Sequence, residues 1–182
     1  MNTQRGMRLH IGFFGKRNAG KSSLVNKISG QKLSIVSDIK GTTTDAVQKA
    51  MELLPVGPVL LIDTAGIDDE GDLGQLRIEK TYNALMRSDI SVFVSDNEKL
   101  SEIEKEFIKK IKENNSKIIS VINKTDLGEL NDEDEEFLKN NTDKLLKTSA
   151  IKEDNFIFEF KKALVELSPD EFINQNVILS DI

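Results

Sequence analysis

The stretch G-K-R-N-A-G-K-S, from Gly15 to Ser22, directly follows the apolar run Leu9 to Phe14. A strand that runs into a glycine loop and then into a helix is the context of a phosphate-binding P-loop. Glycine permits backbone conformations that a β-carbon would hinder, so successive N–H groups can surround phosphate oxygens at the positive end of the helix. These residue types are common enough for a chance match, but the preceding strand and three later motifs argue against chance.

Each position of this loop has a predicted role. Lys21 would lie against the β- and γ-phosphates, as a binding and a catalytic residue. The Ser22 hydroxyl would bind Mg²⁺, which prefers oxygen ligands and keeps several waters. The loop residues expected to contact the nucleotide are Asn18, Ala19, Gly20, Lys21, Ser22 and Ser23.

A second motif, D-T-A-G from Asp63 to Gly66, ends the apolar run Val59 to Ile62. A buried parallel strand would deliver this acid to the carboxyl edge of the sheet, beside the P-loop. Asp63 would support Mg²⁺ through water, and the N–H of Gly66 would meet the γ-phosphate during hydrolysis. Standing alone, the motif would also fit a strand that ends in an ordinary turn.

A third motif, N-K-T-D, follows the apolar run Ile118 to Ile122. Asp126 can accept hydrogen bonds from N1–H and from the exocyclic amine of guanine, whereas adenine offers neither donor at these positions. A site built on buried polar partners rejects the mismatched base by roughly 10⁴-fold. The motif therefore favours GTP over ATP, with Asn123 and Lys124 bracing the loops around the base.

A fourth motif, T-S-A from Thr148 to Ala150, follows another apolar stretch. The backbone N–H of Ala150 would meet the O6 atom of guanine, and Ser149 would lie beside the base. This match is weak by itself, and its position after the other three motifs is what makes it informative.

The residue that orients the attacking water is not evident. In small GTPases of the Ras type a glutamine follows D-T-A-G, whereas this chain has Ile67. The acidic segment after it lies near two glycines that could act as hinges, and Asp69 and Glu70 are candidates for orienting water. Gln75 is a further candidate. A solvated switch loop without a catalytic acid fits the same residues.

Composition limits the classes of function. The chain has 182 residues, of which 38% are hydrophobic and 31% charged, as expected for one globular domain. Its net charge of −6 argues against a nucleic-acid-binding face on this chain. The apolar runs are too short to span a membrane, and residues 1–8 lack the apolar core of a signal peptide, so we expect a cytoplasmic protein.

The chain contains no cysteine and a single histidine, His10. It therefore offers no disulfide, no thiolate zinc site and no cysteine-ligated iron–sulfur cluster. His10 is expected to be a packed or surface residue of the first strand.

The order of apolar runs and helical periodicities predicts an α/β fold. The turn from Pro55 to Pro58 is too short for a crossover, so the strands on either side should be antiparallel. We expect a three-layer P-loop NTPase with a Ras-like G-domain fold: a mostly parallel six-stranded sheet with one antiparallel strand, and helices on both faces. The expected strands are Leu9–Phe14, Gln48–Leu54, Val59–Ile62, Ile90–Ser95, Lys117–Ile122 and Leu145–Thr148. The expected helices are Lys21–Ser29, Gly74–Met86, Ser101–Asn114, Asp132–Asn140 and Asn155–Glu166.

Two features concern the organisation of the chain. The acidic run Glu129 to Glu136 could be a cation site, but a solvated loop that leads to a helix N-terminus is the better interpretation. Residues 1–167 are expected to form one GTP-binding G domain, and residues 168–182 a C-terminal linker or tail, because Pro169 stops the last helix.

Asn18, together with S-D-I-K-G-T-T-T-D from Ser37 to Asp45, resembles GTPases of the TrmE–Era–EngA group. Potassium-activated members of that group carry an asparagine in the P-loop. The resemblance implies a K⁺ ion held by the Asn18 side chain and by the backbone carbonyls of Ser37 and Ile39, where positive charge would lower the barrier. Alternatively, the asparagine simply tolerates an unusual backbone conformation.

The same resemblance assigns roles to the threonines of this stretch. Thr43 would be the switch threonine that binds Mg²⁺ and takes part in hydrolysis, and Thr42 would contact the nucleotide beside it.

Within that group, three stretches are similar to the GTPase domain of the HydF family, maturation factors for diiron hydrogenase. They are Val36–Asp45, the strand pair Met51–Gly66, and Ile67–Thr81. The resemblance implies a longer protein, homodimeric through a domain absent from this chain, with a further cluster-binding domain. Its partners would be radical-SAM hydrogenase maturases and apo-hydrogenase, and GTP would control their association.

Three functional hypotheses remain open at this point. The first is a GTP-hydrolysing switch, slow by itself, that serves metallocofactor assembly. The second is a ribosome- or tRNA-associated GTPase of the same group, whose RNA-binding domain would lie elsewhere because this chain is acidic. The third is a non-catalytic module that acts through nucleotide occupancy, which Ile67 leaves open.

Overall fold

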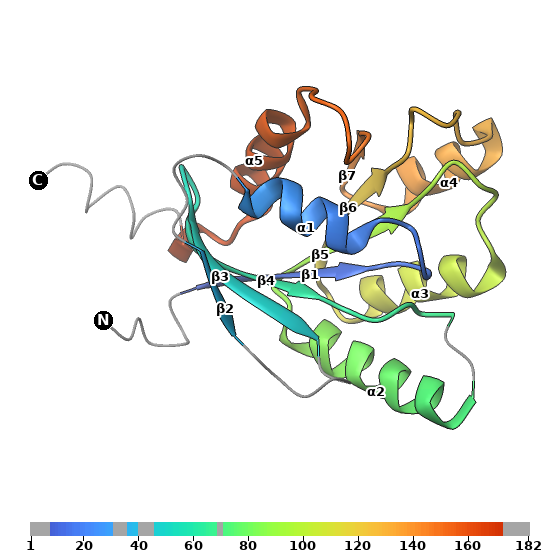
Figure 1. The fold of residues 1–182 in the computed structure, drawn as a ribbon, viewed down its shortest axis with the longest axis horizontal. Helices are drawn as coiled ribbons and strands as arrows, with labels where there is room; N and C mark the ends of the chain where they lie inside the picture. The colour runs from blue at the N-terminus through green and yellow to red at the C-terminus, as the bar shows by residue number, and fades with distance from the viewer. Residues whose placement is uncertain (1–7, 31–35, 40–45, 69–70, 173–182) are drawn as a thin grey trace, which may run out of the picture.

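The computed structural model describes residues 8–30, 36–39, 46–68 and 71–172. Within these ranges seven strands form one sheet in the order β2-β3-β4-β1-β5-β6-β7, with helices on both faces (Figure 1). The strands are β1 (Leu9–Phe14), β2 (Val36–Ile39), β3 (Val47–Leu53), β4 (Gly57–Asp63), β5 (Ile90–Ser95), β6 (Lys117–Ile122) and β7 (Lys144–Lys147). The helices are α1 (Lys21–Ser29), α2 (Gly71–Arg87), α3 (Glu102–Glu113), α4 (Asp132–Asn141) and α5 (Phe156–Leu167).

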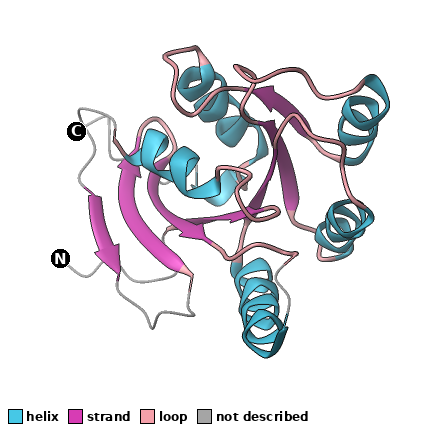
Figure 2. Ribbon diagram, turned by 45° about the vertical axis from the view of Figure 1, so that its right-hand side comes forward, coloured by secondary structure: helices cyan, strands magenta, loops and turns pink. Residues whose placement is uncertain are grey.

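One strand, β3, runs against the others. It pairs antiparallel with β2 and with β4, whereas the pairs β1–β4, β1–β5, β5–β6 and β6–β7 are parallel. The predicted fold class and the antiparallel hairpin at Pro55 are therefore confirmed. Figure 2 shows that the resulting sheet is twisted, as β-sheets in general are.

The sheet has one strand more than expected, because β2 was not predicted. Val36–Ile39 contains a serine and an aspartate, which are poor strand formers, so its local signal is weak. Pairing with β3 provides the missing stabilisation, with Ser37 opposite Ala50 and Ile39 opposite Gln48.

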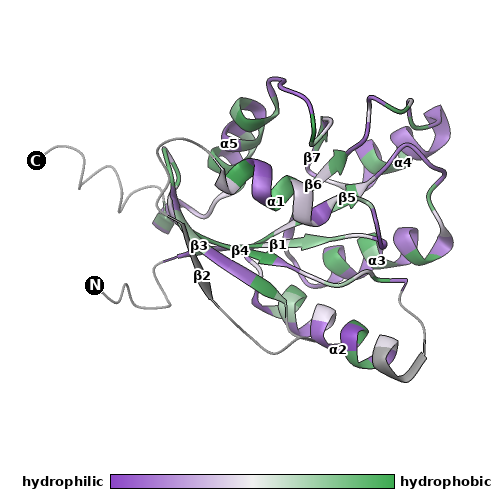
Figure 3. Ribbon diagram, in the orientation of Figure 1, coloured by the Kyte–Doolittle hydropathy of each residue, from purple (hydrophilic) through white to green (hydrophobic). Residues whose placement is uncertain are grey.

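Successive side chains along each strand point to opposite faces of the sheet, so the apolar core has one part on each face. Leu9, Ile11 and Phe13 of β1 pack with Leu24 of α1 and Phe160 of α5. Figure 3 shows apolar residues on the central strands and on the sides of the helices that approach them. The core on the opposite face includes Phe14, Leu60, Ile62, Phe93, Phe107, Ile108 and Leu138.

Side-chain caps mark the starts of α3 and α4, whereas α1 and α5 begin without one. α1 begins and ends as predicted, whereas α2 begins at Gly71, three residues before the predicted start at Gly74. At the start of α3, Ser101 accepts from the Glu104 N–H, and Glu104 accepts from the Ser101 N–H, which is a capping box.

The acidic run Glu129–Glu136 begins in a loop and continues from Asp132 into the first turn of α4, so it leads into a helix N-terminus as predicted. The side chain of Asn131 accepts from the Asp134 N–H at 2.9 Å and caps the helix. Asp134 is buried, accepts from the Leu100 N–H at 2.9 Å, and lies 2.9 Å from the Lys105 ammonium. Among the described residues, no group of three potential metal-ligating side chains is found.

His10 is half-buried on β1, where its ring Nδ1 lies 3.1 Å from the Arg87 carbonyl. None of the helices described by the structure combines the length and the apolar character needed to cross a bilayer. α5 ends at Leu167 with Ser168 as its C-cap, and Phe172 packs against the core. The division of the chain at residue 168 stays a prediction.

Candidate nucleotide-binding site

The four sequence motifs meet at one edge of the sheet. The P-loop follows β1, D-T-A-G spans the end of β4, N-K-T-D follows β6, and T-S-A follows β7. These strands are parallel, so their carboxyl ends share an edge, which is where open α/β sheets bind ligands. A cleft of about 510 Å³ lies there, lined by Arg17, Asn18, Gly20, Lys21, Ser22, Ser23, Thr64, Gly66 and Lys124.

The backbone of the P-loop requires its glycines. Gly15 has φ of +152° and Gly20 has φ of +99°, values that side chains rarely permit. A Cβ on Gly15 would lie 2.2 Å from the Val94 carbonyl oxygen, and one on Gly20 would lie 2.1 Å from Asn123 Nδ2. Asn18 has φ of 59°, a left-handed conformation that asparagine tolerates, so the backbone alone supplies a reason for this residue.

Lys21 is the first residue of α1, and its side chain turns back into the loop. The residue is 7% exposed, and its ammonium donates to the carbonyl oxygens of Gly15 at 2.9 Å and Lys16 at 2.6 Å. A cation at the N-terminus of a helix is suited to bind phosphate.

Ser22 and Asp63 form a pair suited to a metal ion. The Ser22 hydroxyl donates to Asp63 Oδ2 at 2.5 Å, while Asp63 Oδ1 is buried without a hydrogen-bond partner among the described residues. Burial raises the pKa of Asp63, and the hydrogen bond from Ser22 and the charge of Lys21 oppose this rise. A hydroxyl beside an unpaired carboxylate oxygen is a donor set that Mg²⁺ prefers, so these residues fit the metal that this fold family implies.

The segment after D-T-A-G packs against the P-loop. A Cβ on Gly66 would lie 2.7 Å from the backbone nitrogen of Arg17, which shows how closely the two loops approach. The Ile67 N–H donates to the Gly15 carbonyl at 3.2 Å, and Asp68 Oδ1 accepts from the Arg17 N–H at 2.8 Å. The Ile67 side chain is 6% exposed and belongs to the core.

Several predicted residues are not placed in the cleft. Thr42, Thr43, Asp69 and Glu70 lie outside the described residues, so their roles stay predictions. Gln75 is exposed on α2.

The predicted potassium ligands come from two separate places, the P-loop and the strand β2. The backbones of Ser37 and Ile39 belong to β2, which β3 and β4 separate from β1. Neighbouring strands are about 4.8 Å apart, so these carbonyls lie across the sheet from the strand that carries the P-loop. An ion shared with Asn18 stays a prediction.

Asn123 joins the P-loop to the T-S-A loop. The residue is 1% exposed, its Nδ2 donates to the Ala19 carbonyl at 3.0 Å, and its Oδ1 accepts from the Ala150 N–H at 3.0 Å. The Lys124 ammonium donates to the Asn18 carbonyl. Both side chains thus connect neighbouring loops, while their role around a bound base stays a prediction. A guanine O6 atom would have to share the Ala150 donor with Asn123.

Asp126 lies beside the T-S-A loop. The Ser149 hydroxyl donates to Asp126 Oδ1 at 2.7 Å, and this hydrogen bond lowers the pKa of Asp126. The carboxylate is therefore ionised at neutral pH, as an acceptor for two purine donors must be.

One acid beside the P-loop was not predicted. Asp96 follows β5, is 5% exposed, and lies 3.1 Å from the Lys16 ammonium and 3.9 Å from that of Lys124. Glu98 lies 2.7 Å from the same Lys16 ammonium. Asp96 therefore connects the P-loop to the base-binding loop, and an acid directly after an apolar strand, the signal used for Asp63, could have identified it.

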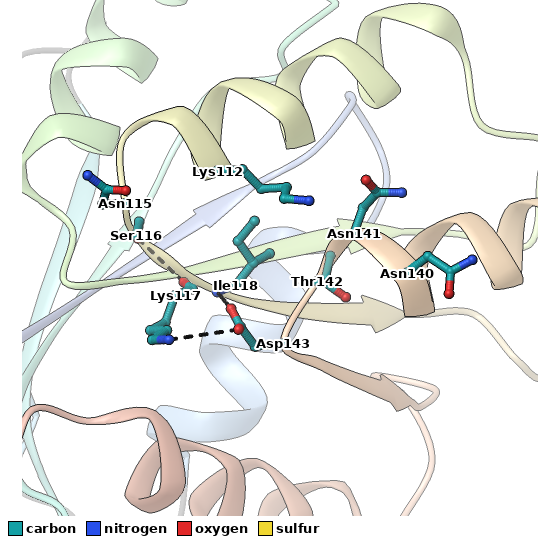
Figure 4. A pocket seen from close by; sticks show the side chains of 9 residues that line it. All are labelled: Lys112, Asn115, Ser116, Lys117, Ile118, Asn140, Asn141, Thr142 and Asp143. Atoms are coloured by element: carbon teal, nitrogen blue, oxygen red, sulfur yellow. Dashed lines mark hydrogen bonds and ion pairs between the residues drawn. The ribbon is translucent and has the colours of Figure 1, made fainter.

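A second hollow, of about 320 Å³, lies at the opposite edge of the sheet (Figure 4). It is lined by residues at the ends of α3 and α4 and at the start of β6, among them Lys112, Lys117 and Asn141. Asp143 accepts from the Ile118 N–H at 2.8 Å and lies 4.0 Å from Lys117. These contacts order the turns before β6 and β7, far from the four motifs.

The parallel sheet, the buried P-loop lysine and the paired N-K-T-D and T-S-A loops define the class of this protein as a P-loop GTPase. Residues 10–124 match the model of a family described as 50S ribosome-binding GTPase. The chain belongs to this family.

Known relatives support the predicted TrmE–Era–EngA-like group. The chain is 40% identical to the GTPase Der of Clostridium kluyveri over 124 residues, which is 65% of this chain and 28% of Der. It is 35% identical to the tRNA modification GTPase MnmE of Clostridioides difficile over 144 residues, 77% of this chain and 30% of MnmE. The chain thus spans less than a third of these curated relatives.

Solved structures of Era are similar in fold and sequence. A point variant of Aquifex aeolicus Era bound to GDP.AlF4⁻ gives a TM-score of 0.70 at 28% identity, covering 88% of this chain and 56% of Era. Era in complex with MgGDPNP and nucleotides 1506–1542 of 16S ribosomal RNA gives 0.71 at 28% identity, covering 90% and 58%. These matches do not single out the HydF family within the group.

Proposed function

We propose that this domain is a GTP-hydrolysing switch whose nucleotide state controls another part of a longer protein. The observation that carries the proposal is the bridge made by Asn123, which ties the phosphate-binding loop to the base-binding loop. One nucleotide that occupies both loops would stabilise this arrangement, and loss of the γ-phosphate would release the segment after Gly66.

The residues divide into three groups in this proposal. Mg²⁺ is held by Ser22 and Thr43 and supported by Asp63. The phosphates are held by Lys21 and the loop backbone, with the N–H of Gly66 at the γ-phosphate. The base is read by Asp126 and by the N–H of Ala150. The remaining contacts with the nucleotide are made by Asn18, Ala19, Gly20, Ser23, Thr42, Asn123, Lys124 and Ser149.

Hydrolysis without a switch glutamine is expected to be slow. The buried Ile67 has no polar group to orient water, so Asp69 or Glu70 is proposed for that role. Phosphate release from GTP, measured with Mg²⁺ and K⁺, tests the proposal. Tight GTP binding without any phosphate release would instead make the domain a non-catalytic module.

Potassium activation is a finer part of the same proposal. An extra cation next to the developing charge would lower the barrier, and Asn18 lies in the loop where its side chain could bind that ion. Turnover should be faster in KCl than in NaCl, and Asn18→Ala should remove the difference. Equal rates of the parent protein in the two salts would refute potassium activation.

For the downstream role, the comparisons favour a ribosome- or tRNA-associated GTPase. The family is described as ribosome-binding, MnmE is named for tRNA modification, and one Era structure contains 16S ribosomal RNA. The net charge of −6 makes this domain a poor RNA-binding surface, so RNA contacts would belong to another part of the longer protein.

A second candidate role is assembly of the diiron site of hydrogenase. It is favoured by the stretches Val36–Asp45 and Ile67–Thr81, which resemble the HydF family. The longer protein should then capture hydrogenase maturases and apo-hydrogenase from a lysate, in a nucleotide-dependent way. Nucleotide-dependent capture of ribosomes or tRNA, without these proteins, would support the first candidate.

A further inference from the structure

The T-S-A loop is tied to α1 by a single lysine. The Lys27 ammonium lies within hydrogen-bond distance of four oxygens: Thr148 Oγ1 at 3.2 Å, the Ser149 carbonyl at 3.1 Å, the Lys152 carbonyl at 2.9 Å and Asp154 Oδ1 at 2.8 Å. Its side chain is only 14% exposed. An ammonium has three N–H donors, so the four oxygens share them around one charge.

Asp154 completes this arrangement from the other end of the loop. Its Oδ1 also accepts from the Phe156 N–H at 3.0 Å, and its Oδ2 accepts from the Thr148 hydroxyl at 2.6 Å and the Ser149 N–H at 3.4 Å. Although burial opposes ionisation, the hydrogen bonds from Lys27 and Thr148 lower the pKa of Asp154. The carboxylate therefore holds the start of the loop and the first turn of α5 together.

In the T-S-A loop, taken as Thr148 to Asp154, Ala150 is partly buried against the apolar core. Ile151, its bulkiest apolar side chain, is 82% exposed, and Lys152 and Glu153 are exposed as well. Polar contacts add to this packing, with Asn123 holding Ala150 on one side and the Lys27–Asp154 pair holding the flanking residues on the other.

We propose that Lys27 and Asp154 are positioning residues that fix the T-S-A loop and thereby set guanine selectivity and the rate of nucleotide release. The inference rests on the proposed reading of guanine O6 by the Ala150 N–H. Adenine presents an amine where guanine presents O6, so an immobile N–H donor favours guanine and disfavours adenine. A loosened loop weakens GDP binding, has little effect on ADP, and opens more often for release.

The test compares Asp154→Asn and Lys27→Met with the parent chain. Each variant should release a fluorescent GDP analogue about tenfold faster in stopped-flow measurements. The ratio of the ADP and GDP dissociation constants should fall by about the same factor, while kcat at saturating GTP stays unchanged. Lys27→Arg, which keeps the charge and the donors, should largely retain the parent behaviour.

A matched control for Asp154→Asn is Glu166→Gln, which also removes one negative charge, in this case from α5. Glu166 pairs with Lys144 at the amino end of β7, whereas the T-S-A loop follows the carboxyl end. This variant should release GDP at the parent rate. Thermal unfolding without nucleotide verifies that each variant is folded. If a variant is not folded, Thr148→Val, which removes only the hydroxyl, is used in its place.

Two results would overturn the proposal. GDP release and selectivity could stay at parent values in both Asp154→Asn and Lys27→Met, or GDP and ADP affinity could fall equally, as for a general loss of structure. If the Ala150 N–H does not read guanine O6, the result is different, because the parent chain itself would then show no preference for GDP over ADP.

Discussion

Replacing Asp63 with asparagine should separate the stability of the domain from its metal dependence. In the nucleotide-free protein, Asp63 Oδ1 is buried without a partner among the described residues. An unsatisfied buried polar group costs about 1–3 kcal/mol, and more when charged. Asparagine keeps an acceptor for the Ser22 hydroxyl and removes the charge. We expect the variant to be more stable by ~1 kcal/mol, which raises Tm by about 2–4 °C in a domain of this size.

The pH dependence of this gain follows from the direction of the pKa shift. Burial raises the pKa of Asp63 in the folded state above its value in the unfolded chain. The folded state therefore binds the proton more readily, and ionisation reduces stability as pH rises through the folded pKa. The advantage of Asp63→Asn should be present at about pH 8 by this argument and should vanish as the pH approaches about 4, the ordinary pKa of aspartate.

Nucleotide binding should change in the opposite sense. An amide NH₂ cannot support a divalent ion, and loss of an outer ligand typically weakens metal affinity by about 10–100-fold. Calorimetry with GDP should therefore show a loss of affinity of about 10–100-fold, or ~1.4–2.7 kcal/mol, with Mg²⁺. With EDTA in place of Mg²⁺, the variant and the parent should bind alike.

Asp170→Asn is a suitable control, because it removes the same charge from an exposed position. It should change neither the melting temperature nor the Mg²⁺ dependence. The reasoning would be refuted if Asp63→Asn lowered the stability of the nucleotide-free protein at pH 8, or if its GDP affinity kept the full dependence on Mg²⁺.

Three further substitutions test separate parts of the structure. Lys21→Ala should lower GTP affinity by about 100-fold, from the loss of charged hydrogen bonds to phosphate, and titration of a fluorescent GTP analogue would measure this; retained affinity would contradict the P-loop role. Asp126→Asn should shift the preference from guanine toward xanthine nucleotides, measured as the ratio of XDP to GDP affinity, and an unchanged ratio would contradict the base-reading role. Ser101→Ala should remove the capping box of α3 and destabilise the domain by about 1 kcal/mol, with unchanged GTP turnover; an unchanged melting temperature would show that the cap contributes nothing.

The sequence alone located the loops that are proposed to hold the phosphates and the base, because the signals of these loops are local. Gly15 and Gly20 are needed for backbone conformations at their own positions, as their positive φ values and close neighbours confirm. Asp63 and Asn123 were identified because each follows an apolar run that ends at the carboxyl edge of a parallel sheet. The antiparallel hairpin was predictable from the length of its turn alone.

Only the tertiary structure determined the contacts between residues that are far apart in the chain. β2 is a strand because β3 lies beside it, not because its own four residues favour extension. Lys27 and Asp154 are 127 residues apart, and Asp96 meets Lys16 from a different strand. A lysine on a helix and an acid in a loop carry no local pattern that marks them as partners. The chain therefore encodes the chemistry of each loop in short motifs, while the relative positions of the loops depend on how the whole sheet is assembled.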